Sequence, residues 1–498
     1  MADDPAGMLT TRVARGAAWI GMIRIALRAI GFVNTLILAR LLTPDDFGLV
    51  AIAVSLMQLM QNVSDIGVAQ SQIRFRDGDQ GQRDLLFTLS LIRGVILGGI
   101  LALLAPMLAA LYGDPRLLSI MLVLAGSAFI QSLINPKFFE FERDLNYRPE
   151  FIVAVTAKLT TVVISIFVAI TTGSYWAIVV GVAAGSVLQT ALSYLVTSYR
   201  PRLTMKGSPA LTSFTGWMTG ISLLMALTNK LDPLILGRLL GAGPTGGYVV
   251  GAQLSQLATD DIATPIVRAS YPGMTTIRTD PERLRRGFLI GAQAASTTAL
   301  PAGVGLSLVA PEVTTLLLGP GWELAATTMM VLAPIYGLMT VFQGLQGYAY
   351  AIDAPQRVFY RQAIVLSFRI PLFVVATIVF GISGALSAAA FGGVLFILLQ
   401  LRLYAQLSGR SVLEPLLAVR RSIVATLMMM VAVIGVSAAL PVTETVDFGQ
   451  VLLKVCMGAS VFFGTAFSLW CLGGRPDGAE ARLLHVIIRR GRSEVGDA

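Results

Sequence analysis

Charged residues are scarce in this chain of 498 residues, and their scarcity excludes an ordinary soluble protein. Only 13% of the residues are charged, about half the usual share, while 55% are hydrophobic and the mean hydropathy is +0.75. The apolar residues gather in runs of about 20, which is the length of a membrane-spanning helix; clear cases are residues 93–112, 151–171, 176–196 and 421–441. The alternation typical of barrel strands is absent. The sequence therefore predicts an all-α polytopic membrane protein.

Cysteine and histidine are almost absent, which excludes the common disulfide and metal sites. The two cysteines, Cys456 and Cys471, fall in one predicted helix, about 22 Å apart at the usual helical rise, and this is too far for a disulfide. The one histidine, His485, cannot build a Cys/His metal centre alone. We expect no metal and no cofactor, apart from coupling to H⁺ or Na⁺.

Basic residues follow a pattern that fixes a topology. Most of the 37 Lys and Arg residues fall in alternate loops, starting with the N-terminal segment that carries Arg12 and Arg15. The opposite loops hold only Arg40, Arg116 and Arg238. Because positively charged loops stay in the cytoplasm, both termini are predicted to be cytoplasmic. The net charge of +9 lies mostly in these cytoplasmic loops, which face anionic lipid, and nucleic-acid binding is not required to explain it. About fourteen spans are predicted, at 17–38, 47–70, 87–111, 117–135, 151–171, 175–196, 213–237, 247–271, 288–317, 324–350, 362–381, 384–404, 422–440 and 449–471.

An internal repeat divides the predicted spans. Residues 36–42, LILARLL, recur as LILGRLL at 234–240, and a tryptophan precedes the arginine of each copy by 21 residues. We predict an N-terminal six-helix lobe at 12–200, a C-terminal six-helix lobe at 210–406, a helix pair at 421–472 and a cytoplasmic tail at 473–498. Both lobes would enter from the cytoplasm, as parallel repeats. Transporters place their substrate between such repeats and rock them to expose it on either side.

Several motifs carry a family resemblance. The stretch 36–72 resembles the first two helices of polysaccharide transporters of the MOP superfamily, the Wzx-type flippases, in its R-L-L-x-P-x-x-F-G turn and its S-D-x-G helix end. Further matches are FEFERDLNY at 139–147, GSYWA at 173–177, DPERL at 280–284, and the Ala310-Pro311 pair followed by LLGPGW at 317–322.

The resemblance covers roughly residues 10–470. It implies fourteen helices in two lobes around a central cavity, which carry undecaprenyl-diphosphate-linked oligosaccharides across the bacterial inner membrane by alternating access. The product would serve exopolysaccharide, capsule or O-antigen synthesis. Polysaccharide polymerase and export proteins are partners that the resemblance implies.

Cations inside the predicted spans are the first candidates for substrate binding. Arg24 and Arg28 are four residues apart and share one helix face, and Lys230 and Arg268 lie in later spans. An arginine fork suits a diphosphate, and charge within a membrane is costly unless it has a function. The alternative is that these side chains snorkel to the headgroups. Snorkelling is the interpretation that we favour for three shallower cations, which are Arg93, Lys158 and Arg369.

Polar and acidic residues form a second set. Gln58, Gln61, Asn62 and Asp65 make one helical stripe, which could face a cavity and sugar hydroxyls or join neighbouring helices. Asp232, Asp260 and Asp261 could pair with cations or take part in ion coupling, because a buried carboxylate can accept a proton near neutral pH.

Two other functions remain open. A multidrug or cation exporter of the same superfamily would want acidic and aromatic cavity residues, whereas these spans carry cations. An integral-membrane glycosyltransferase or polysaccharide polymerase would want acidic residues in an outside loop. Asp45 and Asp46 are the candidate pair there, and turn chemistry is the competing interpretation.

Overall fold

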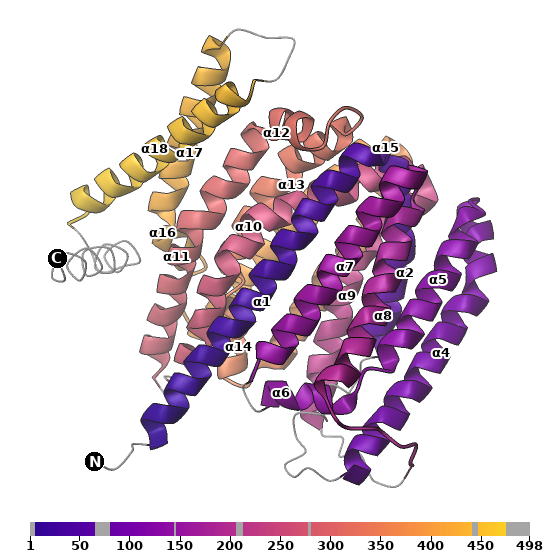
Figure 1. Ribbon diagram of the computed structural model, residues 1–498. Coiled ribbons are helices and arrows are strands. Elements are labelled where there is room, and N and C mark those ends of the chain that lie inside the picture. Colours follow the sequence, from indigo (N-terminus) through magenta and orange to yellow (C-terminus); the bar gives the residue numbers. More distant parts are fainter. Residues whose placement is uncertain are drawn as a thin grey trace, which may run out of the picture. The chain divides into compact units, whose positions relative to one another are not determined.

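The computed structural model describes residues 5–64, 80–143, 146–205, 213–276, 280–440 and 447–474. Within these ranges only the backbone is described at 5–18, 20, 63, 82, 142–143, 213–219 and 261–276. All regular secondary structure in this part of the chain is helical (Figure 1). Contacts divide the chain into two compact units, Met1–Gly246 and Gly247–Ala498, which we describe separately.

Unit 1 is built from long helices. They are α1 (Pro5–Leu41), α2 (Pro44–Ser64), α4 (Gln80–Tyr112), α5 (Arg116–Ser132), the short η1 (Pro136–Phe139) and α6 (Glu140–Arg143), α7 (Arg148–Thr172), α8 (Trp176–Val196) and α9 (Ser213–Leu240). Helix α10 (Ala242–Thr276) begins in this unit and continues into unit 2.

Unit 2 contains the remaining helices. They are α11 (Pro281–Leu308), α12 (Ala310–Leu317), α13 (Glu323–Phe342), α14 (Leu345–Ala351), α15 (Pro355–Ser408), α16 (Glu414–Ala418), α17 (Arg420–Ala439) and α18 (Phe448–Leu472).

The predicted all-α membrane fold is confirmed. Eight of the described helices are long and apolar enough to cross a membrane, or nine if the bent pair α11 and α12 counts as one span. Each of the fourteen predicted spans overlaps a described helix, and two of them share the 54 residues of α15. Gly381, with φ 61° and ψ −140°, breaks α15 between those two spans. This backbone conformation is one that glycine adopts without strain.

Three details differ from the sequence prediction. The span predicted at 288–317 is not straight, because α11 and α12 meet at 76°. The span predicted at 324–350 is interrupted between α13 and α14. The helix of the first of these spans begins earlier than residue 288, at Pro281, with Asp280 as its N-cap.

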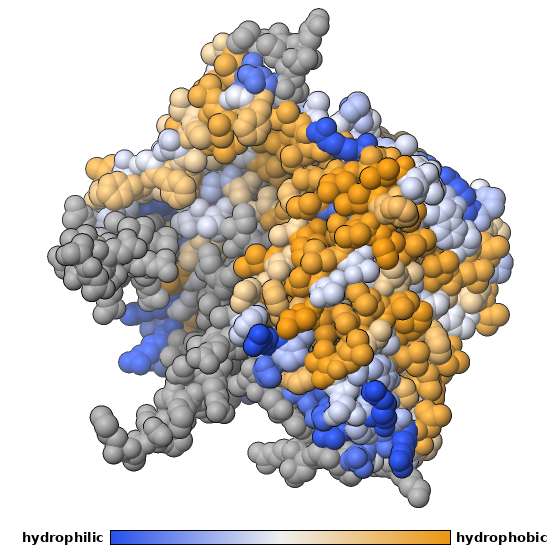
Figure 2. Space-filling model, viewed as in Figure 1, coloured by the Kyte–Doolittle hydropathy of each residue, from blue (hydrophilic) through white to orange (hydrophobic). Residues whose placement is uncertain are grey.

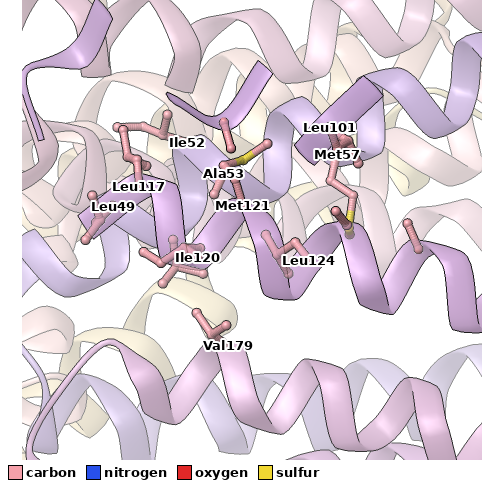
Figure 3. Packing of buried hydrophobic residues seen from close by; sticks show 14 of the residues in the cluster. Leu49, Ile52, Ala53, Met57, Leu101, Leu117, Ile120, Met121, Leu124 and Val179 are labelled. Carbon is pink, nitrogen blue, oxygen red and sulfur yellow. The ribbon is translucent and has the colours of Figure 1, made fainter. Parts of the chain in front are cut away.

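The core of unit 1 is a cluster of aliphatic side chains where α2, α4, α5 and α8 meet (Figure 3). Helix α2 contributes Leu49, Ile52 and Met57, and helix α5 contributes Ile120 and Leu124, all of them nearly fully buried. Lipid tails are as apolar as these side chains. The cluster is therefore stabilised by close packing rather than by removal of hydrocarbon from water.

Helices α7 and α8 pack along a seam of small residues. A Cβ atom on Gly181 would lie 2.8 Å from the carbonyl oxygen of Thr161 and would also collide with Ser165. A Cβ atom on Gly185, one turn further, would collide with the hydroxyl of Thr161 and lie 3.3 Å from the carbonyl oxygen of Ala157. The G-x-x-x-G spacing thus lets the two backbones approach closely, as in many membrane helix pairs.

Large apolar side chains also cover the outside of unit 1. Leu103 of α4, Phe167 of α7 and Leu195 of α8 expose 79%, 66% and 79% of their surface. Figure 2 shows hydrophobic residues gathered over α7 and α8, with hydrophilic ones near the end that carries α6. This surface fits contact with lipid.

In unit 2, polar contacts hold the C-terminal helix pair against α11 and α12. Ser296 of α11 donates to Ser422 of α17 at 2.8 Å. The ammonium of Lys454 on α18 binds Glu312 of α12 at 2.6 Å, and the lysine is 8% exposed. Glu414 of α16 pairs with Arg285 of α11 and accepts a hydrogen bond from Tyr404 at 2.6 Å. These contacts fix both ends of the pair α17 and α18.

Candidate functional site

Three cations of unit 1 lie along neighbouring parts of α1 and α7. Arg24 and Arg28 are both exposed on α1, one turn apart. Lys158 of α7 reaches across to α1, because a Cβ atom on Gly31 would lie 3.6 Å from its Cε and 3.8 Å from its Nζ. Gly31 follows Arg28 by three residues, a rise of about 4.5 Å along the helix. The Lys158 ammonium is therefore within about one helical turn of Arg28 along α1.

Lys158, for which the sequence favours snorkelling, lies against α1 in the structure. Its side chain is half-buried and points at α1. It forms no hydrogen bond or ion pair with a described residue, and the same holds for Arg24. Arg28 does have a partner. The sequence gives one signal for Lys158, a glycine at position 31 that leaves room for it, but the sequence does not reveal which helix faces α7.

Lys230 is the third candidate cation of unit 1 with no described partner. It is half-buried on α9, beside the exposed Asn229. Asp232, two residues on, is 9% exposed and has a partner other than Lys230. This agrees with the helical geometry, since residues two apart point in different directions.

The predicted polar stripe of α2 has mixed environments. Gln61 donates to Gln131 of α5 at 3.4 Å, and Gln131 donates to Ser186 of α8 at 3.0 Å. This chain joins three helices. Asn62 is exposed and donates at 2.8 Å to the carbonyl oxygen of Gln58 in its own helix. Asp65, the last member of the stripe, lies outside the described residues.

Of the predicted acidic pair, only Asp260 has a described side chain. Its carboxylate accepts hydrogen bonds from Thr340 and from Gln343, the latter at 3.3 Å. The side chains of Asp261 and Arg268 lie outside the described part of the chain. Among the described residues, no group of three or more His, Cys, Asp or Glu could hold a metal ion.

Asp45 and Asp46 are used in a turn that ties together three connections of unit 1. Asp46 accepts hydrogen bonds from the backbone and hydroxyl of Thr43 at 3.0 and 2.6 Å, which caps α2, and from the backbone of Tyr175 at 3.1 Å. Asp45 pairs with Arg116 at 2.9 Å, and Arg116 lies over the Tyr175 ring. The motifs R-L-L-T-P-D-D-F-G and G-S-Y-W therefore meet at one place.

Asp114 completes this cluster. It binds Arg116 at 2.7 Å, and this hydrogen bond lowers the pKa of the Asp114 carboxyl, although partial burial opposes the shift. The same contact raises the pKa of Arg116. Both groups are therefore charged at neutral pH.

Comparison with protein families gives a match over residues 37–327, more than half of the chain, to a family described as polysaccharide biosynthesis protein. The chain belongs to the polysaccharide biosynthesis protein family. This confirms the resemblance seen in the sequence motifs.

Several relatives of this family member are known proteins. It is 23% identical over 339 residues to the lipopolysaccharide biosynthesis protein WzxC of Escherichia coli, covering 66% of this chain and 68% of that protein. It is 21% identical over 330 residues to the succinoglycan biosynthesis transport protein ExoT of Rhizobium meliloti, covering 66% and 67%. The teichuronic acid biosynthesis protein TuaB of Bacillus subtilis is 23% identical over 347 residues, with coverage of 68% and 71%.

Solved structures show the same fold. The lipid II flippase MurJ, in an inward closed conformation, matches with a TM-score of 0.72 at 13% identity and covers 90% of this chain and 98% of its own. An inward-facing multidrug resistance transporter of the MATE family, in the MOP superfamily, matches with a TM-score of 0.59 at 15% identity, covering 78% and 98%. This member of the polysaccharide biosynthesis protein family is thus a multi-pass membrane protein with the fold of the MOP superfamily.

Proposed function

We propose that this protein is a flippase that moves undecaprenyl-diphosphate-linked oligosaccharide units across the bacterial inner membrane by alternating access. The units would feed the synthesis of an exopolysaccharide, capsule or O-antigen. Membership in the polysaccharide biosynthesis protein family supports this assignment, as do relatives described as transport and biosynthesis proteins for several polysaccharides. Both termini would be cytoplasmic, and the two six-helix lobes would be the moving parts.

The observation that carries the proposal is cationic charge without a protein partner. Lys158 projects against α1 beside Arg28, and neither Lys158 nor Arg24 is neutralised by a described residue. A charge in a membrane-spanning helix is costly, so unpaired cations are kept where an anion is bound. A lipid diphosphate presents several phosphate oxygens, which arginine forks and a lysine ammonium can share. We add Lys158 to the predicted binding residues Arg24, Arg28, Lys230 and Arg268.

The two alternative functions have weaker support. A cation exporter shares the fold, but three unpaired cations in the spans of unit 1 would repel its substrate. A glycosyltransferase or polymerase would need Asp45 and Asp46 free for a metal or a base, whereas both carboxylates are engaged by Thr43, Arg116 and Tyr175. We therefore propose a transporter without covalent chemistry.

Ion coupling and protein partners remain predictions. Asp260 is held by Thr340 and Gln343, an arrangement that suits a structural role and leaves proton or Na⁺ binding to be measured. Polysaccharide polymerase and export proteins are the expected partners.

The binding residues can be tested with purified protein in liposomes, by following the movement of a lipid-diphosphate oligosaccharide between leaflets. We expect Arg28→Ala and Lys158→Met each to slow transport by about 10- to 100-fold, the range that follows from losing a hydrogen bond to a charged group. Arg28→Lys should keep part of the activity, since it keeps the charge and loses the fork.

Arg40→Ala is the matched control, because Arg40 is also an exposed arginine of α1 and lies twelve residues from Arg28. Transport by this variant should match the parent protein. Equal transport by Arg28→Ala and the parent would remove Arg28 from the substrate site. An equal loss in Arg40→Ala would mean that general helix charge, and not a binding site, is being measured.

A further inference from the structure

The chain that leaves α8 runs back along α4. Residues 197–205 have no regular secondary structure, but their backbone is tied to two successive turns of α4. The N–H of Arg202 donates to the carboxylate of Asp84 at 2.7 Å, and the N–H of Thr204 donates to the hydroxyl of Thr88 at 2.9 Å. Two residues of extended chain span about 6.6 Å, and four residues of helix rise about 6 Å. The segment is therefore extended and runs parallel to the axis of α4.

Tyr199 fixes the start of this extended segment. Its hydroxyl donates to the carboxylate of Asp84 at 2.5 Å and to the carbonyl oxygen of Gln80 at 3.3 Å. Its carbonyl oxygen accepts a hydrogen bond from Asn135 at 2.8 Å. Tyr199 is therefore level with the first turn of α4, and each following residue lies closer to the predicted span at 87–111.

The exposed side chains of the segment are two arginines followed by two large apolar residues. Leu203 and Met205 are two residues apart, so they share one face of the extended chain, and they expose 68% and 67% of their surface. Arg200 and Arg202 are exposed as well, and no described carboxylate pairs with either guanidinium. The chain thus presents positive charge first and hydrocarbon second as it runs along α4.

The depth of these side chains follows from their neighbours on α4. Arg202 is level with Asp84, just before the predicted span, whereas Met205 follows Thr204, which is level with Thr88 inside the span. By the charge pattern this end of the span faces the cytoplasm. The arginines would therefore lie at the phosphate groups of the inner leaflet, and the apolar pair would lie about one helical turn deeper. Interfacial segments bury their apolar side chains about 5–10 Å into this boundary.

We propose that residues 199–205 anchor unit 1 to the inner leaflet by binding an anionic phospholipid. Arg200 and Arg202 contact its headgroup, and Leu203 and Met205 lie among acyl chains. The charge decides the occupant, because two guanidiniums without a carboxylate are best compensated by a headgroup with net negative charge. The hydrogen bonds to α4 hold the apolar pair at this depth, which a solvated loop would not need. The inference does not depend on the transport of an oligosaccharide.

The depth of the segment can be measured with a bimane probe on the full-length protein. Cys456→Ser and Cys471→Ser remove the native cysteines, and the probe is attached at Leu203→Cys or at Met205→Cys. We expect lipids brominated on their acyl chains to quench the probe at either position, and aqueous iodide to leave it bright. Ser198→Cys is the matched control, because Ser198 is exposed and comes before the residues that climb along α4. Iodide should quench a probe there.

The same probe at Leu203→Cys reports the choice of headgroup in bilayers that mix phosphatidylcholine with phosphatidylglycerol. Brominated phosphatidylglycerol should quench at about one tenth of the mole fraction that brominated phosphatidylcholine needs, since each basic residue near an anionic surface strengthens binding about fivefold. Arg200→Gln with Arg202→Gln should abolish this preference. Arg200→Lys with Arg202→Lys should keep most of it, because the charge is kept.

A matched control for charge is Arg402→Gln with Arg420→Gln. Both arginines are exposed in unit 2, and both are predicted to lie on the cytoplasmic side, so the same charge is removed elsewhere. The preference for phosphatidylglycerol should be unchanged in this pair. Quenching by brominated phosphatidylcholine checks that each variant keeps the probe in the bilayer.

Four results would overturn the anchor. Two of them are iodide quenching at Leu203→Cys equal to that at Ser198→Cys, and equal quenching by the two brominated lipids. The third is an equal loss of preference in the control pair of unit 2. The fourth is displacement of brominated phosphatidylglycerol by undecaprenyl diphosphate at one molecule per protein, because the segment would then bind the proposed substrate. A protein that binds phospholipid as expected but moves no oligosaccharide would contradict the proposed function alone.

Discussion

The buried ion pair between Lys454 and Glu312 gives the sharpest expectation for stability. Lys454 is 8% exposed, and the second carboxylate oxygen of Glu312 is buried without a partner. Removing one member leaves the other charge buried and unpaired, which commonly costs about 3–5 kcal/mol. Because the Glu312 side chain is 25% exposed, we expect the lower end, about 3 kcal/mol, for either Glu312→Gln or Lys454→Met.

The assay is thermal unfolding of the purified protein in detergent. At about 2–4 °C per kcal/mol for a unit of this size, each single variant should unfold about 6–12 °C below the parent. The double variant should be less destabilised than the sum of the two by about 2 kcal/mol or more, since it buries no lone charge. Arg286→Met is the control, because its pairing with Glu282 at 3.5 Å is 69% exposed on the arginine side, and its loss should leave the unfolding temperature close to that of the parent. Strict additivity of the two single variants would refute the ion pair as an anchor of the C-terminal helix pair.

Two further expectations concern packing and pH. Gly181→Val should destabilise the α7–α8 seam by about 3 kcal/mol, because its side chain would collide with α7. Gly99→Val is the control and should cost about 1 kcal/mol or less, since a Cβ atom there meets no heavy atom within 4 Å. Thermal unfolding measures both, and equal shifts in unfolding temperature would contradict the close packing of the seam. The pKa of Asp114 is lowered by Arg116, so its contribution to stability should be complete above the ordinary aspartate pKa near 4 and should fade as the pH drops through the lowered value. The difference in unfolding temperature between the parent and Asp114→Asn should therefore shrink below about pH 4, and a difference that is constant down to pH 2 would contradict this.

The helices could be predicted from the sequence because hydropathy and loop charge both constrain them. A missed span would invert the charge pattern of every later loop. Even the break at Gly381 could be placed, since one apolar stretch of that length exceeds a bilayer. The bend between α11 and α12 could not, because both helices are apolar and nothing local marks the angle between them.

The candidate site was less predictable, since it depends on which helices are neighbours. The depth of Lys158 in its predicted span suits snorkelling. Only the position of its side chain beside Gly31 of α1 suggests a role in substrate binding. Gln61 fits a cavity stripe and a helix contact equally well until Gln131 is found beside it.

The proposed function depends on the direction in which a lipid-linked sugar is moved. The most direct measurement deletes the gene and asks on which face of the inner membrane diphosphate-linked oligosaccharide accumulates, with and without a plasmid copy. We expect completed units to accumulate on the cytoplasmic face and to disappear when the plasmid restores the protein, and their mass would identify the substrate. Accumulation on the outer face, or no change in lipid-linked sugar, would contradict a flippase.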